Sequence, residues 1–175
     1  MVLRADAQRN LERVLDAAME VFAESGPDSS IDEIARRAGV GHATVFRRFP
    51  TKDSLIWAVV ERRVAEIRAH AEAALASDDP GAAFFDFTWK VAELQAASRG
   101  LSECFAQCGK ALPGKNELDA LVGKIVVRAQ RAGALRSDVK PQDVPTLIRA
   151  ALTSAPDRQW RRYVGVVLDG LRPSS

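Results

Sequence analysis

The sequence has little of what most enzymes, secreted proteins and membrane proteins need. Its 175 residues include two cysteines, two histidines and one tyrosine, which leaves few groups for acid–base catalysis and no framework of paired cysteines. No charge-free apolar run approaches the ~20 residues of a membrane span. The N-terminal segment MVLRADAQRN also lacks the apolar stretch of a signal peptide. We therefore expect a cytoplasmic globular protein without a membrane partner.

Motifs of common catalytic and cofactor sites are also missing from the sequence. It contains no P-loop, no G-x-S-x-G nucleophile elbow and no H-E-x-x-H zinc motif. Cys104 and Cys108 have a spacing that suits a metal or redox pair, but neither His42 nor His70 is nearby in sequence. Buried free thiols are the simpler interpretation, because reduced cysteine packs as a small apolar residue. We expect no enzyme, no cofactor and no metal site.

Apolar residues, in contrast, are plentiful and regularly spaced. They make up 47% of the chain, enough for a compact core, and recur at helical spacing in about nine segments separated by glycine, proline and serine. No strand pattern appears, so the expected fold is all-α. We expect a three-helix unit in residues 1–51, preceded by a loose polar arm before Asp6, and a helical bundle in 52–175. The bundle begins with a connecting helix, 52–76, about 37 Å long at 1.5 Å per residue.

Residues 31–52, IDEIARRAGVGHATVFRRFPTK, predict two short helices joined by a tight turn. Ser30 and Glu33 form a capping-box pattern at the start of the first helix. Gly39 stands where a helix commonly ends at positive φ, and Pro50 disfavours helical geometry in the residue before it. The apolar residues of both helices are spaced to face one small core. The side chains predicted to point outward are those of His42, Ala43, Thr44, Arg47 and Arg48.

Positive charge gathers on the same stretch. Five basic residues and no acidic ones lie between positions 36 and 52, although the whole chain has a net charge of only +2. The five are Arg36, Arg37, Arg47, Arg48 and Lys52. Neutralisation of DNA phosphates requires such a concentration of charge. A solvated face on an ordinary helical hairpin is the alternative, but the capped helix, the glycine turn and the short second helix together favour DNA binding.

The stretch GVGHATVFRRFPTKDSLI resembles the recognition-helix signature of the TetR family of transcriptional regulators. The usual form is G-V-S-x-x-T-L-Y-x-H-F, followed by a short turn, a lysine and an acidic residue. Gly41, Phe46 and Arg48 replace the commoner Ser, Tyr and His. Phe46 lacks the hydroxyl that usually touches a phosphate, whereas Arg48 adds a permanent charge and a possible bidentate grip. RAGALRSDVKPQDV and QWRRYVGVVLDGLRP also resemble the family's C-terminal part.

Together, the helix-turn-helix pattern and the resemblance assign DNA contacts to one set of residues. His42 and Ala43, at the start of the recognition helix, are best placed for base edges. Arg47 could read guanine or grip a phosphate. The remaining family positions mostly hold the DNA backbone, and such contacts orient the protein without specifying sequence. The full predicted set is His42, Ala43, Thr44, Phe46, Arg47, Arg48 and Lys52.

One recognition helix reads too few base pairs to find a site in a genome. Helix-turn-helix proteins therefore dimerise and place two such helices about 34 Å apart on palindromic double-stranded DNA. The resemblance implies a homodimer in which the last two helices pair with their copies. The predicted interface residues are Tyr163, Val166, Val167 and Gly170. Alternatively, these residues only complete the core of their own subunit.

The resemblance also implies that the C-terminal bundle senses a small molecule and releases DNA when it binds. Few charged groups surround the candidate lining residues, which points to an apolar or aromatic ligand. The candidates are Phe84, Phe85, Phe87, Trp89, Cys104, Phe105 and Cys108. The same residues could equally fill a solid core, and then the chain would be a constitutive DNA-binding or protein-interaction factor. Repression, rather than activation, is adopted only because it is the usual mode of the family.

Overall fold

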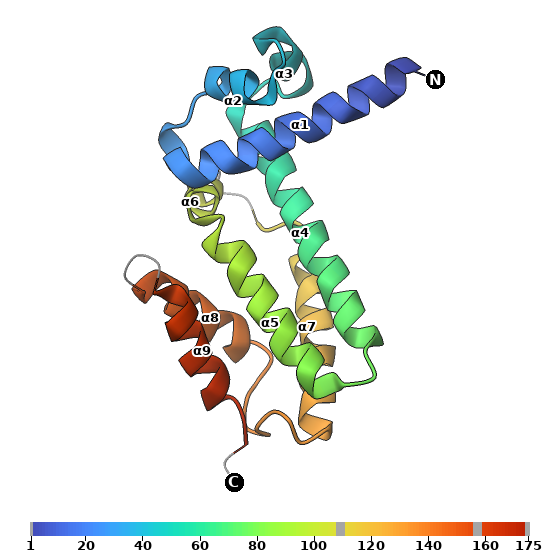
Figure 1. Cartoon of the computed structure of the whole chain (residues 1–175), viewed down its shortest axis with the longest axis vertical. Helices are drawn as coiled ribbons and strands as arrows, with labels where there is room; N and C mark the ends of the chain where they lie inside the picture. The colour runs from blue at the N-terminus through green and yellow to red at the C-terminus, as the bar shows by residue number, and fades with distance from the viewer. Residues whose placement is uncertain (1, 108–110, 156–158, 174–175) are drawn as a thin grey trace. The chain divides into compact units, whose positions relative to one another are not determined.

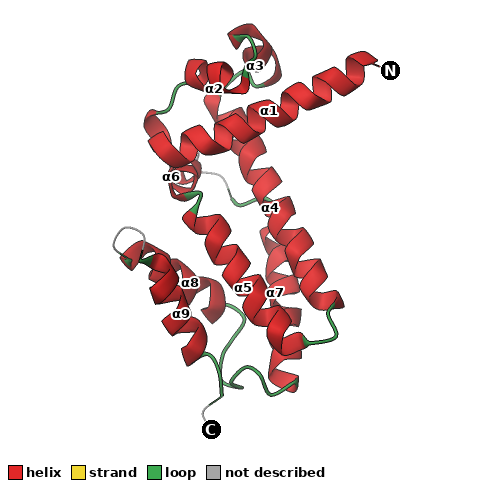
Figure 2. Cartoon of the chain, in the orientation of Figure 1, coloured by secondary structure: helices red, strands yellow, loops and turns green. Residues whose placement is uncertain are grey.

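The structure, a computed structural model, describes the backbone of residues 2–107, 111–155 and 159–173, and the side chains of these residues except 2–5, Pro27 and 104–107. In this part of the chain all regular structure is helical, with nine α-helices and one 3₁₀ turn (Figure 2). The predicted all-α fold is confirmed. In chain order the helices are α1 (Val2–Ser25), η1 (Gly26–Asp28), α2 (Ile31–Ala38), α3 (His42–Arg48), α4 (Lys52–Ala76), α5 (Pro80–Ala96), α6 (Arg99–Gln107), α7 (Lys115–Arg131), α8 (Asp143–Ser154) and α9 (Trp160–Gly170).

The chain divides into two compact units. Unit 1 contains residues 1–63 and 97–113, and unit 2 contains residues 64–96 and 114–175. The chain therefore leaves unit 1 within α4 and returns to it for α6 (Figure 1). This division differs from the predicted one at residue 51, because the first half of α4 and the whole of α6 pack with the N-terminal helices. In the described residues, no helix is both long and apolar enough to cross a lipid bilayer.

Helix α1 is the base on which the rest of unit 1 packs. It contacts α2 on one side and α6 on another, and Val21 and Phe22 are fully buried. The crossing with α6 is close at Gly100, where a Cβ atom would overlap the carbonyl oxygen of Phe22 and lie 3.1 Å from that of Ala23. Glycine is thus required at this position by the close approach of α6 to α1.

The start of α1 differs from the sequence prediction. The helix begins at Val2, whereas a loose arm is predicted before Asp6. The physical reason lies in the composition of residues 2–10, VLRADAQRN, which contains neither glycine nor proline and includes several good helix formers. An arm that is polar on average can still extend a helix whose later turns are fixed by packing.

Unit 2 is built around α5. Phe84, Phe87 and Leu94 are buried in a core to which the second half of α4 and helices α7, α8 and α9 also contribute, and α8 and α9 lie side by side (Figure 1). The Arg128 guanidinium closes the end of α4 by donating to the carbonyl oxygens of Leu75 and Ser77, the latter at 2.8 Å. Asp157, a residue type that the sequence offers as an N-cap for α9, lies outside the described residues.

Candidate nucleic-acid interface

Helix α2 begins and ends at the residues that predict its ends. The Ser30 hydroxyl accepts a hydrogen bond from the Glu33 amide at 3.1 Å. Gly39 has φ 64° and ψ 37°, and its amide donates to carbonyl oxygens of the last turn of α2. A Cβ atom at Gly39 would also overlap the guanidinium of Arg13 from α1. The Ser30 cap and the glycine turn are confirmed, and the turn is additionally packed against α1. Of the predicted capping box only this half is observed, since the Glu33 carboxylate accepts a hydrogen bond from Arg37.

Helix α3 begins and ends close to the predicted residues. Gly41 precedes it in an extended conformation, and the Phe49 amide closes it on the Val45 carbonyl at 2.8 Å. Of the residues predicted to face the small core, Ile34, Ala38, Val45 and Phe49 are buried and Val40 is half-buried. The opposite side of α3 is therefore free to present its side chains.

Six of the seven predicted DNA contacts lie on α3. His42, Ala43, Phe46, Arg47 and Arg48 are exposed, whereas Thr44 and Lys52 are half-buried. Phe46 is 47% exposed, which is high for a large apolar side chain. The five exposed residues thus form one surface of unit 1, called here the recognition surface.

Lys52 is not on α3 but is the first residue of α4. Its ammonium donates to the carbonyl oxygen of Ser29 at 2.6 Å. The Thr51 hydroxyl caps the same helix by accepting from the Ser54 amide at 3.1 Å. In this structure Lys52 therefore joins the start of α4 to the segment before α2.

Arg37 is bound within unit 1 by three carboxylates. Its guanidinium donates to Glu24 at 2.8 Å and to Glu33 at 3.3 Å, and Glu20 lies 3.9 Å away. The hydrogen bond to Glu24, followed by the charges of the three glutamates, raises the pKa of Arg37 above its ordinary value. The basic run is thus divided between Arg37, which joins α1 to α2, and the exposed Arg36, Arg47 and Arg48.

His42 has two neighbours that the sequence analysis missed. Its Nδ1 atom forms a hydrogen bond with Oδ1 of Asp32, in the first turn of α2. Its ring stacks on Phe46, with centroids 5.1 Å apart and an angle of 22° between the planes. The separation of four residues could have indicated the stacking, since such residues are neighbours on a helix. Nothing in the sequence indicates the Asp32 contact, which depends on how α2 and α3 cross.

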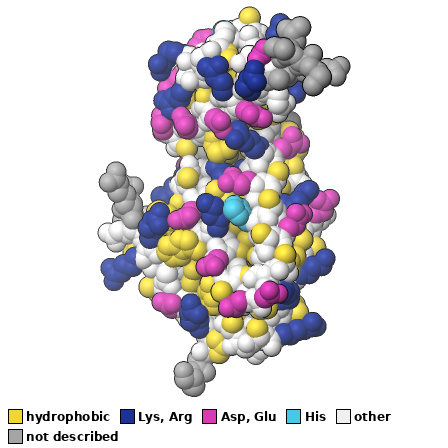
Figure 3. Space-filling view, turned by 45° about the vertical axis from the view of Figure 1, so that its right-hand side comes forward, with side chains coloured by type: hydrophobic (Ala, Val, Ile, Leu, Met, Phe, Trp, Pro, Cys, Tyr) yellow, Lys and Arg dark blue, Asp and Glu magenta, His cyan; other side chains and the backbone are white. Residues whose placement is uncertain are grey.

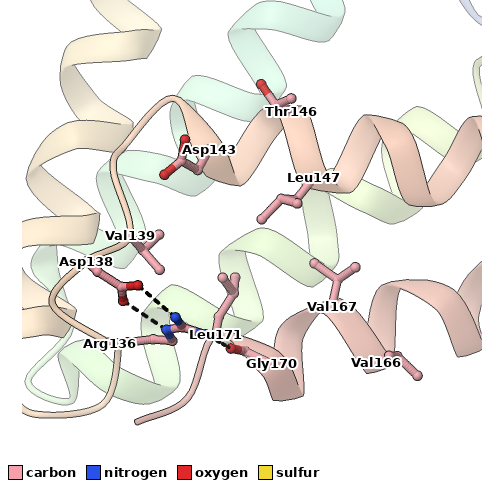
Figure 4. Close-up of a pocket in the computed structure, with 10 residues that line it drawn as sticks. All are labelled: Arg136, Asp138, Val139, Asp143, Thr146, Leu147, Val166, Val167, Gly170 and Leu171. Carbon is pink, nitrogen blue, oxygen red and sulfur yellow. Dashed lines mark hydrogen bonds and ion pairs between the residues drawn. The ribbon is translucent and has the colours of Figure 1, made fainter.

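The predicted dimer residues lie on the α8–α9 side of unit 2. Val166 is 67% exposed and Tyr163 39%, Gly170 is exposed, and Val167 is half-buried. A hollow of about 410 Å³ runs between the two helices, where Leu147 and Val167 point toward one another and Val166 points away from α8 (Figure 4). We call this pocket the α8–α9 hollow. The residues that line it are Arg136, Asp138, Val139, Asp143, Thr146, Leu147, Val166, Val167, Gly170 and Leu171.

The predicted ligand residues separate into two groups. Phe84, Phe85 and Phe87 are buried in the core of unit 2, where the rings of Phe84 and Phe85 meet edge-on at 5.1 Å. Trp89 is half-buried and lies 6.0 Å from Trp160 of α9. The side chains of Cys104 and Phe105, and Cys108 as a whole, lie outside the described residues.

Charge outside the recognition surface is mixed. Basic and acidic side chains alternate over the face drawn in Figure 3, and several form exposed ion pairs. Arg68 with Glu117 at 2.7 Å and Arg62 with Asp16 at 2.6 Å are two of these. Because the charges in such pairs cancel, the surface that carries them is nearly neutral. It attracts a polyanion less than a cluster of unpaired positive charges would.

Comparisons with known proteins agree with this geometry. Residues 14–59 match the family described as bacterial regulatory proteins, tetR family, and residues 79–173 match the C-terminal domain described as transcriptional regulator SbtR-like. The crystal structure of a TetR transcription regulatory protein from Mycobacterium vanbaalenii is 41% identical, covers 98% of this chain and 99% of its own, and has a TM-score of 0.77.

Curated relatives match over shorter segments. The uncharacterized HTH-type transcriptional regulator TtgW of Pseudomonas putida is 42% identical over 60 residues, which are 34% of this chain and 45% of that protein. The HTH-type transcriptional repressor Rv3405c of Mycobacterium tuberculosis is 51% identical over 49 residues, which are 27% of this chain and 26% of that protein. The match thus spans less than half the length of each. Because the two family matches together cover more than half of its length, the chain belongs to the TetR family of transcriptional regulators.

Proposed function

We propose that this chain is a cytoplasmic, sequence-specific repressor that binds a palindromic operator as a homodimer and is released by a small apolar ligand. One observation carries the DNA-binding part. Helix α3 exposes His42, Arg47 and Arg48. It follows α2, whose start is capped by Ser30 and whose end turns at Gly39. A short helix with one face packed on the protein core and the other face exposed and polar is the element that helix-turn-helix proteins insert into the major groove.

The exposed arginines suit phosphate contacts, and the start of α3 suits base contacts. Arg47 and Arg48 follow each other in the last turn of α3, where their long side chains can reach the DNA backbone on either side of the groove. His42 and Ala43 occupy the first turn, the part of a recognition helix that meets base edges. Arg37 contributes little to this attraction, because three glutamates already balance its charge.

The α8–α9 side supports the homodimer. Val166 and Tyr163 are exposed apolar or aromatic residues on α9, Leu147 on α8 is 39% exposed, and the Cβ positions of Gly165 and Gly170 have no atom within 4 Å. Glycine inside a helix costs about 1 kcal/mol relative to alanine. Close approach of a neighbouring helix is a common compensation, and a second copy of α8 and α9 would supply it.

The aromatic residues of α5 support ligand release less directly. Phe84, Phe85 and Phe87 give unit 2 an apolar interior, which suits an apolar or aromatic effector. Their burial also favours the alternative, a constitutive DNA-binding or protein-interaction factor whose bundle is solid. The alternative predicts that no apolar compound raises the melting temperature of the protein or releases it from DNA.

The experiment that tests the function is selection of bound sequences from random duplex DNA, followed by binding to the selected site across a salt series. We expect an enriched palindrome with half-sites about one helical turn apart and a steep loss of affinity with salt. Absence of any enriched sequence, or weak binding that is indifferent to sequence, would contradict the proposal. The selected operator then allows a screen for compounds that release the protein.

A further inference from the structure

The contact between Asp32 and His42 places a carboxylate where a DNA-binding surface should least favour one. Asp32 is exposed, belongs to the first turn of α2 and lies beside the base-reading end of α3. A negative charge there repels phosphates and lowers affinity for every sequence. Interaction with the α2 helix dipole explains an acidic residue at this position, but it does not explain the hydrogen bond to the ring of His42.

This hydrogen bond fixes one of the two ring nitrogens. An ionised carboxylate has no hydrogen to donate, so Nδ1 of His42 must carry the proton that Oδ1 of Asp32 accepts. In a neutral imidazole, the other nitrogen, Nε2, is then an acceptor. A carboxylate or carbonyl partner commonly selects the tautomer of a histidine in this way.

A second contact restricts the plane of the same ring. Phe46, one turn further along α3, stacks on His42 at a centroid distance of 5.1 Å and an angle of 22°. Asp32 therefore holds one edge of the ring and Phe46 covers one face, while half of the His42 side chain stays exposed. Nε2 lies on the other side of the ring from the atom that Asp32 holds, and neither of these two contacts involves it.

We propose that Asp32 is a specificity-determining residue that acts through His42. It holds the imidazole so that Nε2 accepts a hydrogen bond from an exocyclic amino group in the major groove. Adenine N6 and cytosine N4 are such donors, whereas the corresponding groups of thymine and guanine are acceptors. His42 thus selects the amino bases, A or C, over the keto bases, G or T, at one position of each half-site. This inference rests on the proposed function.

The test compares base preference among five proteins: wild type, Asp32→Ala, His42→Ala, the double variant, and Asp53→Ala as a matched control. Asp53 is also an exposed acidic residue in the first turn of a helix, α4, so its removal changes the charge and the helix dipole in the same way. The operator position to be tested is the one at which His42→Ala loses the base preference of wild type. The affinity of each protein is then measured for four operator duplexes that differ only in the base at this position. Thermal melting verifies that each variant is folded.

We expect wild type to favour A or C over G or T at that position by about tenfold, the usual effect of one hydrogen bond. Asp32→Ala should reduce the ratio to about twofold or less and strengthen binding to unrelated DNA. The double variant should show no further loss at that position, because the two residues act as one unit. Asp53→Ala should keep the wild-type ratio.

Other outcomes would overturn the inference. A wild-type preference for G or T, an unchanged ratio in Asp32→Ala, or losses that add in the double variant would each show that Asp32 does not act through an accepting His42. An equal loss in Asp53→Ala would assign the effect to charge or to the helix terminus. Failure of the proposed function looks different, because wild type itself would then select no sequence.

Discussion

The recognition surface and the α8–α9 hollow are both exposed parts of paired helices, but their chemistry is opposite. The first presents mainly polar and basic side chains from α3, and the glycine of the turn before it, Gly39, is packed against Arg13. The second exposes Val166 and Leu147, and the Cβ positions of its glycine, Gly170, and of the nearby Gly165 of α9 face open space. The first surface is therefore complete within one subunit and suited to a polyanion. The second has the composition of a surface that another apolar surface covers.

A charge in the middle of the apolar surface should have the largest effect. Val166→Asp would place a carboxylate on a side chain that is 67% exposed, so the subunit should fold normally while the proposed dimer loses its contact. We expect monomers in sedimentation experiments and a loss of operator affinity of about 100-fold or more, because one half-site alone binds weakly.

Val127→Asp is the control for that experiment. Val127 of α7 is also an exposed apolar residue, at 40%, but it does not line the α8–α9 hollow. It should leave both the oligomeric state and operator affinity unchanged. If Val166→Asp remained a dimer with full affinity, the α8–α9 surface would not be the interface.

The scaffold behind the recognition surface can be tested at Gly100. Gly100→Ala would push a methyl group into the carbonyl oxygen of Phe22, so α6 or α1 must shift, and overpacking of this kind costs about 1–3 kcal/mol. We expect a lower free energy of unfolding in urea. Gly123→Ala in α7 is the matched control, since its new methyl group meets only Pro141 at 3.9 Å and should stabilise by about 0.5–1 kcal/mol. Equal effects of the two substitutions would argue against the close crossing.

Two arginines of the same basic run should respond differently. Arg48→Ala should weaken binding to all DNA sequences by about tenfold and reduce the salt dependence by about one counterion, since Arg48 is proposed to contact a phosphate. Arg37→Ala should instead lower the melting temperature with little change in DNA affinity, because Arg37 joins Glu24, Glu33 and Glu20 within unit 1. A changed base preference in Arg48→Ala would contradict the phosphate assignment.

The smallest effect is expected at the polar end of the α8–α9 hollow. Arg136 donates to both carboxylate oxygens of Asp138, at 2.9 and 2.7 Å, and this hydrogen bonding lowers the pKa of Asp138 below its ordinary value. The lowered pKa stabilises the fold above the ordinary Asp range, and this stabilisation is lost as the pH falls through the lowered value. The melting temperature of Asp138→Asn should therefore fall slightly less than that of wild type as the pH is lowered. Identical acid dependence would mean that the exposed pair contributes nothing.

Most of unit 1 could be predicted from the sequence because its signals are local. Ser30, Gly39 and Pro50 act on residues within one helical turn of themselves, and they delimit α2 and α3 closely. Unit 2 was predicted less well at its boundaries. Pro141 predicts a helix start at its own position, but α8 begins at Asp143, since a proline can either start a helix or stand before it.

The candidate site was predicted as a set of residues but not as a set of contacts. Four side chains of the recognition surface, those of His42, Ala43, Arg47 and Arg48, follow from the spacing along α3. Phe46 was included only through the family resemblance, and Thr44, which was also predicted to point outward, is half-buried. The sequence counted Lys52 and Arg37 with the exposed arginines as one basic run, whereas the structure binds Lys52 to the Ser29 carbonyl and Arg37 to three glutamates. Net charge along a chain is visible in its sequence. Which of those charges is balanced depends on the acidic residues that folding brings beside it.

The sequence by itself determined the all-α fold, the capped helix-turn-helix and the family, because each depends on residues three or four apart or on one contiguous motif. Only the tertiary structure decided that Asp32 meets His42 and that Gly100 lies against the backbone of Phe22. Both depend on where two helices cross. Crossing is set by the packing of whole helix surfaces, which no single spacing along the chain encodes.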